Sequence, residues 1–195
     1  MEKTIKNLAA AFVGESMARN RYGRYAKVAQ AEGYEQLAAI FDETANQEKE
    51  HASQLWKRIQ ELKESKGGDL EEIIVEAAKV PTIFKDSKEN LKAAIAGENW
   101  EHTDMYPGFA DDADAEGLDK IADQLRSIAK AEEHHEERYQ KLLDQLEAGT
   151  IFKKDKEVQW VCRECGYVHT GQEPPEECPS CFHAKAFYQL KCEEY

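Results

Sequence analysis

A repeated arrangement of glutamate and histidine constrains this chain more than any other feature. Glu15 is followed 33 residues later by Glu48 of the run Glu48-Lys-Glu-His51, and Glu98 is followed 34 residues later by Glu132 of the run Glu132-Glu-His-His135. These residues fall in stretches with helical periodicity, where positions three apart share one face. Carboxylates on a face that packs into a core must be hydrogen-bonded, paired or bound to cations. The pattern therefore predicts four helices that meet around neutralised acids.

Apolar spacing predicts the first two of these helices. The first covers residues 4–32 and is ended by Gly33, and the second runs from there to Lys66-Gly67-Gly68. The short link makes the two helices antiparallel neighbours. A long connection follows, in which residues 70–78 have a shorter helical pattern and Pro81 disfavours helix at the residue before it.

The third predicted helix starts at Asp86 or Ser87, either of which can cap it, and runs toward Phe109 with a kink at Pro107. We expect the acidic patch at 111–116 to be a break or an exposed turn. The fourth helix then covers about 117–146. Four long helices with one long connection are typical of the ferritin-like bundle.

Composition excludes several classes of function. A formal net charge of -13 argues against non-specific binding to nucleic acid or to anionic membranes, because both need a cationic surface. The sequence has no run long enough to span a bilayer and no pattern of a secretory signal. We therefore expect a cytoplasmic protein, and in such a reducing compartment the Cys-x-x-Cys pairs formed by four of the 5 cysteines indicate a metal site before disulfides. We expect only packing or an incidental role for Cys192.

The cysteine pairs define a second module. The runs Cys162-Arg-Glu-Cys165 and Cys178-Pro-Ser-Cys181 are separated by 12 residues, and Gly166 can take the turn that follows a cysteine ligand. Four thiolates suit zinc or iron, and so small a module needs such a metal to fold. We expect a bundle at 1–148, a linker at 149–157 and the four-cysteine module at 158–195.

Some residues near the repeated motif keep two interpretations at this point. Glu101 has no counterpart in the other half and is either a surface residue or a seventh ligand. Tyr22 and Tyr106 stand near the faces of Glu15 and Glu98, either as core aromatics or as supporting residues of a site. His102 and His134 lie about 100° round the helix from the candidate ligands, so a surface position or a contact with a ligand is favoured over metal binding.

The repeated motif itself is that of bundle proteins that hold two iron or manganese ions, with one Glu from each of two helices and a Glu-x-x-His pair from each of the others. Bridging carboxylates reduce the repulsion between two cations, and each imidazole supplies a neutral ligand.

Through these motifs the chain resembles the rubrerythrin family over essentially its full length. The resemblance rests on Gly14-Glu-Ser-Met-Ala-Arg-Asn-Arg-Tyr22, Glu48-Lys-Glu-His51, Gly97-Glu-Asn-Trp-Glu-His-Thr-Asp-Met-Tyr-Pro107, Glu132-Glu-His-His135 and the two cysteine pairs. It implies an all-α four-helix ferritin-like bundle followed by a small C-terminal rubredoxin-like metal-binding module.

The resemblance also implies a role for each candidate residue. Glu15 and Glu101 would bind one iron, and Glu98 and His135 the other. Glu48 and Glu132 would bridge the two, and His51 would replace Glu101 on the first iron when the site is reduced. Tyr22 and Tyr106 match tyrosines close to the irons. A single iron, or zinc as a substitute, would be held by Cys162, Cys165, Cys178 and Cys181.

The implied function is that of a non-haem diiron peroxidase in oxidative-stress defence. Hydrogen peroxide would be reduced to water, and electrons would return through the cysteine-bound iron. Because no Gly-rich dinucleotide motif occurs, an NAD(P)H-oxidising protein would feed a separate electron donor such as a rubredoxin or its reductase. Family members form homodimers. The alternatives are a ferritin-like ferroxidase that handles iron and a zinc-ribbon interaction module on a bundle.

Overall fold

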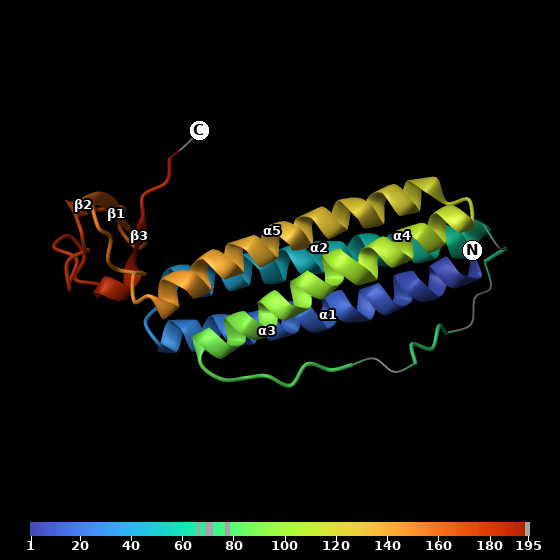
Figure 1. Cartoon of the computed structure of the whole chain (residues 1–195), viewed down its shortest axis with the longest axis horizontal. Helices are drawn as coiled ribbons and strands as arrows, with labels where there is room; N and C mark the ends of the chain where they lie inside the picture. Colours follow the sequence, from blue (N-terminus) through green and yellow to red (C-terminus); the bar gives the residue numbers. More distant parts are fainter. Residues whose placement is uncertain (66, 69–71, 77–78, 194–195) are drawn as a thin grey trace.

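The computed structural model describes residues 1–65, 67–68, 72–76 and 79–193. The bundle contains α1 (Glu2–Ala31), α2 (Glu35–Ser65), α3 (Ser87–Trp100), a π-helical turn η1 (Glu101–Met105), α4 (Tyr106–Ala115) and α5 (Asp119–Glu147). Figure 1 shows α3, η1 and α4 following one another as a single long rod, so four rods form the bundle, with a small module at one end. The predicted fold class is confirmed. Within the described residues, no helix is long and apolar enough to cross a membrane.

Gly33 ends α1 as the sequence predicts. Its φ is +80°, a left-handed conformation that glycine adopts without strain. The N–H of Tyr34 donates to the carbonyl of Ala29 at 2.8 Å, which satisfies a carbonyl that the helix end leaves free. The chain then reverses directly into α2 (Figure 1), so α1 and α2 are antiparallel.

The connection between α2 and α3 runs back along the bundle, and α3 therefore starts at the same end as α2 (Figure 1). Asp86 caps α3 by accepting from the Glu89 N–H at 2.9 Å, as expected. The helix predicted at 70–78 is wrong for residues 72–76, which are irregular; the rest of that range lies outside the described residues. Ile73 and Val75 pack against the bundle core, whereas Ile74 between them is 79% exposed, and this alternation suits an extended chain and not a helix.

The third rod is irregular at η1, not at Pro107. The N–H of Tyr106 bonds to the carbonyl of Glu101, the five-residue step of a π-turn, and Pro107 lies in the first turn of α4. At about 100° per residue, Ala94 and Ala113 would lie about 100° apart round an uninterrupted α-helix. Because the π-turn absorbs one residue, both side chains are fully buried on the same face.

The acidic patch at 111–116 is predicted as a break, and this is wrong for most of it. Residues 111–115 belong to α4, whose face is anchored by the buried Ala113. Arg126 bonds to Asp111 at 3.2 Å and to Asp114 at 2.6 Å, which ties the acids to α5. The turn comes later, at Gly117 with φ +73°, and α5 begins at Asp119.

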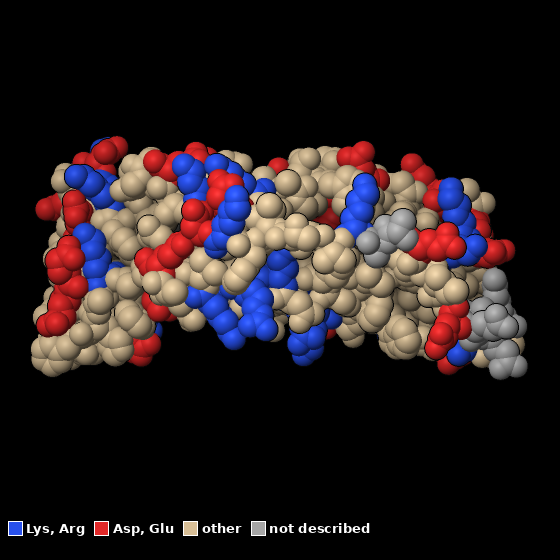
Figure 2. Space-filling model, turned by 90° about the horizontal axis from the view of Figure 1, so that it is seen from below, with Lys and Arg blue, Asp and Glu red and all other residues tan. Residues whose placement is uncertain are grey.

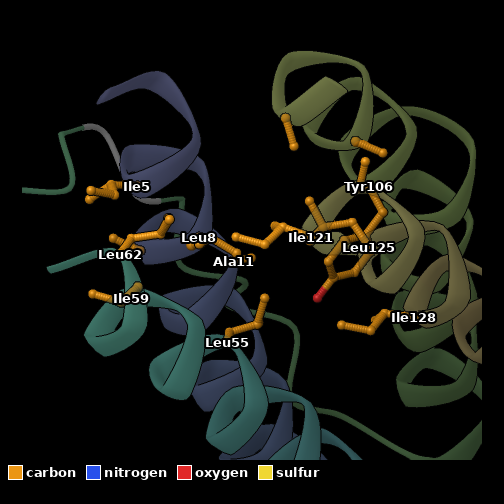
Figure 3. Packing of buried hydrophobic residues seen from close by; sticks show 14 of the residues in the cluster. Ile5, Leu8, Ala11, Leu55, Ile59, Leu62, Tyr106, Ile121, Leu125 and Ile128 are labelled. Carbon is orange, nitrogen blue, oxygen red and sulfur yellow. The ribbon is translucent and has the colours of Figure 1, made fainter. Parts of the chain in front are cut away.

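Two apolar clusters fill the bundle. The first lies toward the N-terminal end of α1 and contains Leu8, Leu55 and Leu125; Figure 3 shows its residues from α1 and α2 facing those from α4 and α5. The second includes Tyr25, Phe41 and Leu143 and occupies the other end. Along α1, Glu15 falls between the two clusters, so the candidate ligands form a polar layer in an apolar core.

The C-terminal module is a three-stranded antiparallel sheet in the order β2-β1-β3, formed by β1 (Val158–Cys162), β2 (Val168–Gly171) and β3 (Tyr188–Leu190), with a 3-10 turn η2 (Lys185–Phe187) before β3. Trp160 is its largest buried side chain. The module lies at the end of the bundle where α1 turns into α2 (Figure 1). Tyr34 stacks there on Phe152 of the linker, with ring centres 6.2 Å apart.

Candidate metal centres

The helices bring all seven predicted acids and histidines into the interior. The side chains are at most 9% exposed, except that of His51 at 16%. They come from every rod of the bundle: Glu15 on α1, Glu48 and His51 on α2, Glu98 on α3, Glu101 on η1, and Glu132 and His135 on α5. No single element contains the site, so it exists only when the bundle is assembled.

The first group of ligand atoms belongs to Glu15, Glu48, His51 and Glu132, which all lie within 4.8 Å of one another. His51 Nδ1 is 2.8 Å from Glu132 Oε1, 3.0 Å from Glu48 Oε2 and 3.8 Å from Glu15 Oε1. Donor atoms that share one cation at about 2.1 Å lie about 3 Å apart. The spacing of this group therefore suits one metal ion.

The second group contains Glu48, Glu98, Glu132 and His135. His135 Nδ1 is 2.7 Å from Glu132 Oε2, 3.1 Å from Glu48 Oε1 and 3.6 Å from Glu98 Oε2. Glu48 and Glu132 thus direct one oxygen to each histidine. Such carboxylates can join two adjacent ions.

Glu101 is buried near these groups but belongs to neither. His51 completes the first group in its place. Burial, together with the charges of Glu98, Glu132 and Glu48, raises the pKa of the Glu101 carboxyl well above its usual range. The resemblance assigns both residues to the same iron, as alternative ligands. In the structure, His51 lies inside the first group and Glu101 lies outside it.

Several buried oxygen and nitrogen atoms in the polar layer lack a hydrogen-bond partner among the described residues, as expected of atoms that bind cations. These atoms are Glu15 Oε2, Glu48 Oε1, Glu98 Oε2, both Glu132 oxygens and His135 Nδ1. Burial and neighbouring acids raise the pKa of Glu15, while burial raises the pKa of Glu98 to about 7. So many clustered carboxylates cannot all stay charged without positive charge between them. The donor set, oxygen with two imidazoles, suits iron or manganese.

Each of the two unshared glutamates receives a hydrogen bond from a buried tyrosine. The Tyr22 hydroxyl donates to Glu98 Oε1, and the Tyr106 hydroxyl donates to Glu15 Oε1. The pairs cross the repeat, because each tyrosine bonds the glutamate of the other half. Sequence spacing places both tyrosines near the site but does not reveal this crossing, which depends on how the rods pack.

The other two histidines of the bundle are not ligands in either group. His102 Nε2 lies 2.5 Å from Glu136 Oε2, and Asn99 Nδ2 donates to the same carboxylate at 3.2 Å. His134 is exposed on α5. Both observations agree with the sequence-based interpretation. Sequence reasoning missed Arg21, whose guanidinium donates to the Tyr22 hydroxyl at 3.3 Å; its place beside Tyr22 in the first motif was the only signal.

The cysteine module gathers its four sulfur atoms into one group. The Sγ atoms of Cys162 and Cys181 lie 3.7 Å apart, as do those of Cys165 and Cys178. A disulfide needs about 2.05 Å, whereas sulfurs at about 2.3 Å from one tetrahedral ion are separated by about 3.8 Å. The arrangement fits a metal site with four thiolate ligands. Cys192 is exposed and outside this group.

Each cysteine pair is followed by a residue in the left-handed backbone conformation. Gly166 follows Cys165 with φ +76°, and Phe182 follows Cys181 with φ +61°. The N–H of Gly166 bonds to the Cys162 carbonyl and that of Phe182 to the Cys178 carbonyl, both at 2.9 Å. The sequence predicted the first turn from its glycine. It contained no sign of the second, because a non-glycine residue rarely adopts this conformation.

Comparison with known proteins places these sites in a family. Residues 6–143 match the family described as Rubrerythrin, and residues 160–189 match the rubredoxin-like domain of rubrerythrin. A protein of Methanocaldococcus jannaschii is 56% identical over 100% of this chain and 96% of its own length. A rubrerythrin of Porphyromonas gingivalis is 47% identical over 96% of this chain and 89% of its own length.

A rubrerythrin of Nitratidesulfovibrio vulgaris is 45% identical over 96% of this chain and 94% of its own length. Among solved structures, nigerythrin in its fully reduced, all-ferrous state superposes with a TM-score of 0.63 at 33% identity. That match covers 96% of this chain and 86% of the nigerythrin chain. The relatives span both the bundle and the cysteine module.

Proposed function

This chain belongs to the rubrerythrin family, and on that premise we propose that it is a non-haem diiron peroxidase that reduces hydrogen peroxide to water. One observation carries the proposal. Glu48 and Glu132 each direct one oxygen to His51 and the other to His135, which is an arrangement for two adjacent ions. The same chain carries a four-cysteine site suited to one-electron transfer.

Seven residues of the bundle would hold the two irons. Glu48 and Glu132 would bridge them, and Glu98 and His135 would bind one. Glu15 would bind the other, together with Glu101 or His51 according to the redox state. The mononuclear iron would be held by Cys162, Cys165, Cys178 and Cys181, where zinc can substitute for it. The unpartnered oxygens of the layer support this assignment.

When bound, two ferrous ions supply the two electrons that, with two protons, convert one hydrogen peroxide to two waters and leave two ferric ions. The protein's own residues prepare the layer for this reaction. The apolar clusters on either side keep bulk water from the carboxylates, which strengthens every electrostatic interaction there. The Tyr22 and Tyr106 hydroxyls each occupy one oxygen of a terminal carboxylate and leave the other free for metal.

Re-reduction needs an external source of electrons. The cysteine module packs at the end of its own bundle, and the second apolar cluster lies between it and the carboxylate layer. This supports a homodimer in which the module of one subunit approaches the bundle of the other. We infer a donor protein such as a rubredoxin or its reductase, fed by an NAD(P)H-oxidising protein in a reducing, cytoplasmic compartment.

The test is anaerobic reduction of the iron-loaded protein followed by one equivalent of hydrogen peroxide per diiron site, with the absorption of both iron centres recorded. We expect the bundle irons to oxidise at once and the cysteine-bound iron to reoxidise as a second equivalent is added. Iron content per chain is measured before and after.

Three outcomes would contradict the proposal. Net uptake of added ferrous iron during turnover would favour the ferritin-like ferroxidase. Zinc in the four-cysteine site of the natural protein, with no reducible chromophore, would favour a structural zinc ribbon. Slow reoxidation of the cysteine-bound iron would exclude it as the relay.

A further inference from the structure

Arg21 is a half-buried cation beside the carboxylate layer that is not one of the proposed ligands. Nη2 lies 3.3 Å from the Tyr22 hydroxyl oxygen, and the guanidinium carbon lies 5.1 Å from the centre of the Tyr22 ring and 6.0 Å from that of Tyr25. Nε is buried without a hydrogen-bond partner among the described residues. Burying a guanidinium costs free energy, so its position needs an explanation.

Arg21 lines a surface hollow between α1 and residues Val80–Phe84 of the connection, and Arg24 lines the same hollow. Figure 2 shows Lys and Arg side chains gathered near the middle of the face that the connection crosses. Arg24 is exposed, whereas Arg21 turns inward to the tyrosine that bonds Glu98. Two neighbouring arginines of one hollow therefore differ in their access to the site.

Gly97 on α3 leaves the room that Arg21 occupies. A Cβ atom on Gly97 would lie 3.1 Å from Arg21 Nη2, closer than ordinary van der Waals contact. Glycine inside a helix is less stable than alanine, so its presence calls for a packing reason. Gly14 and Gly23 on α1 have no such neighbour, because nothing among the described residues lies within 4 Å of a Cβ built on either.

The hydrogen-bonding capacity of the groups fixes the direction of the bonds. A guanidinium has only donors, so the Tyr22 oxygen accepts from Arg21. The single hydroxyl proton of Tyr22 is then committed to Glu98 Oε1. Glu98 Oε2, which has no hydrogen-bond partner among the described residues, remains on the side of His135.

We infer that Arg21 is a positioning residue of the diiron site: seated against Gly97, its guanidinium orients the Tyr22 hydroxyl as a donor to Glu98. The inference rests on the diiron site proposed above. A carboxylate that keeps this hydrogen bond carries less negative charge toward the metal, which favours the ferrous state. The Tyr106–Glu15 pair has no arginine bonded to its hydroxyl in the part of the chain that the structure describes, so the two ends of the site differ.

The experiment measures the reduction potential of the diiron centre in the iron-loaded full chain by anaerobic redox titration. We compare Arg21→Met with Arg24→Met, a change in the same hollow, and Gly97→Ala with Gly23→Ala, a helix glycine in open space. Iron content and circular dichroism verify that each variant is folded and loaded. The absorption of the cysteine-bound iron in the same sample serves as an internal reference.

We expect Arg21→Met to shift the diiron potential to a lower value and Gly97→Ala to shift it by less in the same direction. Both control variants and the cysteine-bound iron should keep the wild-type potential. Gly97→Ala should add nothing in the Arg21→Met background, because it acts through the guanidinium. If Arg21 acts through the hydroxyl, Arg21→Met should also have little effect in the Tyr22→Phe background.

An unchanged potential in Arg21→Met would overturn the inference. An equal shift with Tyr22 and with Tyr22→Phe would also overturn it, because Arg21 would then act only as a nearby charge. These readouts need iron binding but no peroxide chemistry. A chain that binds iron and fails as a peroxidase would therefore refute the proposed function while leaving this inference open to its own test.

Discussion

Glu48 and Glu132 connect the two groups of ligand atoms, because both residues belong to both groups. Each is buried at the centre of the layer, and each approaches one histidine with each of its oxygens. Burial raises the pKa of Glu48, but the neighbouring His135 and His51 imidazoles more than offset this effect, so its pKa is lowered. Burial and neighbouring acids raise the pKa of Glu15, and the hydrogen bond from Tyr106 offsets only part of this effect. The histidines thus favour the charged form of the central Glu48, whereas the peripheral Glu15 depends on cations for its charge.

Glu101 offers a test of this difference between central and peripheral acids. We expect Glu101→Ala to retain two irons in the bundle, because the two groups that share Glu48 and Glu132 do not include it. The diferric absorption spectrum should change. Peroxide turnover should fall by at least the roughly 10–100-fold that loss of a contact supporting a metal typically costs. Iron analysis, the visible spectrum and steady-state assays measure the three effects.

The matched control is Glu133→Ala, an exposed glutamate on α5 next to Glu132. It should change neither the spectrum nor the turnover. A diferric spectrum of Glu101→Ala identical to that of the wild type would contradict a role for Glu101 as a ligand of the oxidised site.

At the residue level, the sequence predicted which residues form the site better than it predicted how they are arranged. Spacing of three residues put Glu48 with His51 and Glu132 with His135, because that step keeps side chains on one helix face. The crossed pairing of Tyr22 with Glu98 could not be predicted, since it depends on where two rods meet. Phe182 was missed for a different reason: its side chain is 73% exposed, and the turn closed by the bond from its N–H to the Cys178 carbonyl gives it a conformation that its residue type disfavours.

Among the elements, η1 shows how an irregular turn preserves a regular core. Periodicity predicted a third helix and placed its distortion at Pro107, because proline is the usual cause of a kink. In the structure, however, the irregular turn is at Glu101–Met105, and Pro107 follows it in the first turn of α4. The extra residue of η1 instead restores the register of Tyr106 and Ala110, which are both fully buried.

Deletion of Thr103 tests this account of η1. Thr103 is exposed within the π-turn, so its removal should convert the turn to regular α-helix and leave the α4 face in the core. We expect the free energy of unfolding to fall by no more than about 2 kcal/mol. Denaturant unfolding followed by circular dichroism gives this quantity.

Deletion of the exposed Lys130 in α5 is the comparison. It would rotate every later residue of the helix by about 100° and turn Tyr139 and Leu142 away from the core. The cost should exceed about 4 kcal/mol or abolish folding. Equal destabilisation by the two deletions would show that η1 does not absorb a residue.

The acidic end of α4 shows the limit of composition as a guide to elements. Residues 111–116 looked like a turn because charged runs are usually solvated. In the structure the run is amphipathic: Ala113 faces the core, and Arg126 neutralises Asp111 and Asp114 from the neighbouring helix. The cation that stabilises it is more than ten residues away in sequence, beyond the reach of a local pattern.

Over the whole molecule, the two metal sites depend on different kinds of structure. The carboxylate layer is assembled by four long rods and bounded by apolar clusters, so the bundle can hold its shape through packing. The cysteine module has a small core of Trp160, Tyr188 and two of its own cysteines. A core of that size needs its metal to stay folded. Zinc can meet this need as well as iron, because both accept four thiolates.

Substitution of zinc for iron in the four-cysteine site therefore separates folding from electron transfer. We expect protein with zinc in the module and iron in the bundle to have a wild-type unfolding transition. Its diferrous site should still consume one equivalent of hydrogen peroxide. Catalytic turnover with an external reductant should fall at least about tenfold, because zinc has no redox chemistry. Stopped-flow oxidation measures the single-turnover activity, and steady-state peroxide consumption measures the catalytic activity of the same sample. If the zinc form had wild-type turnover, electrons would reach the bundle without the module.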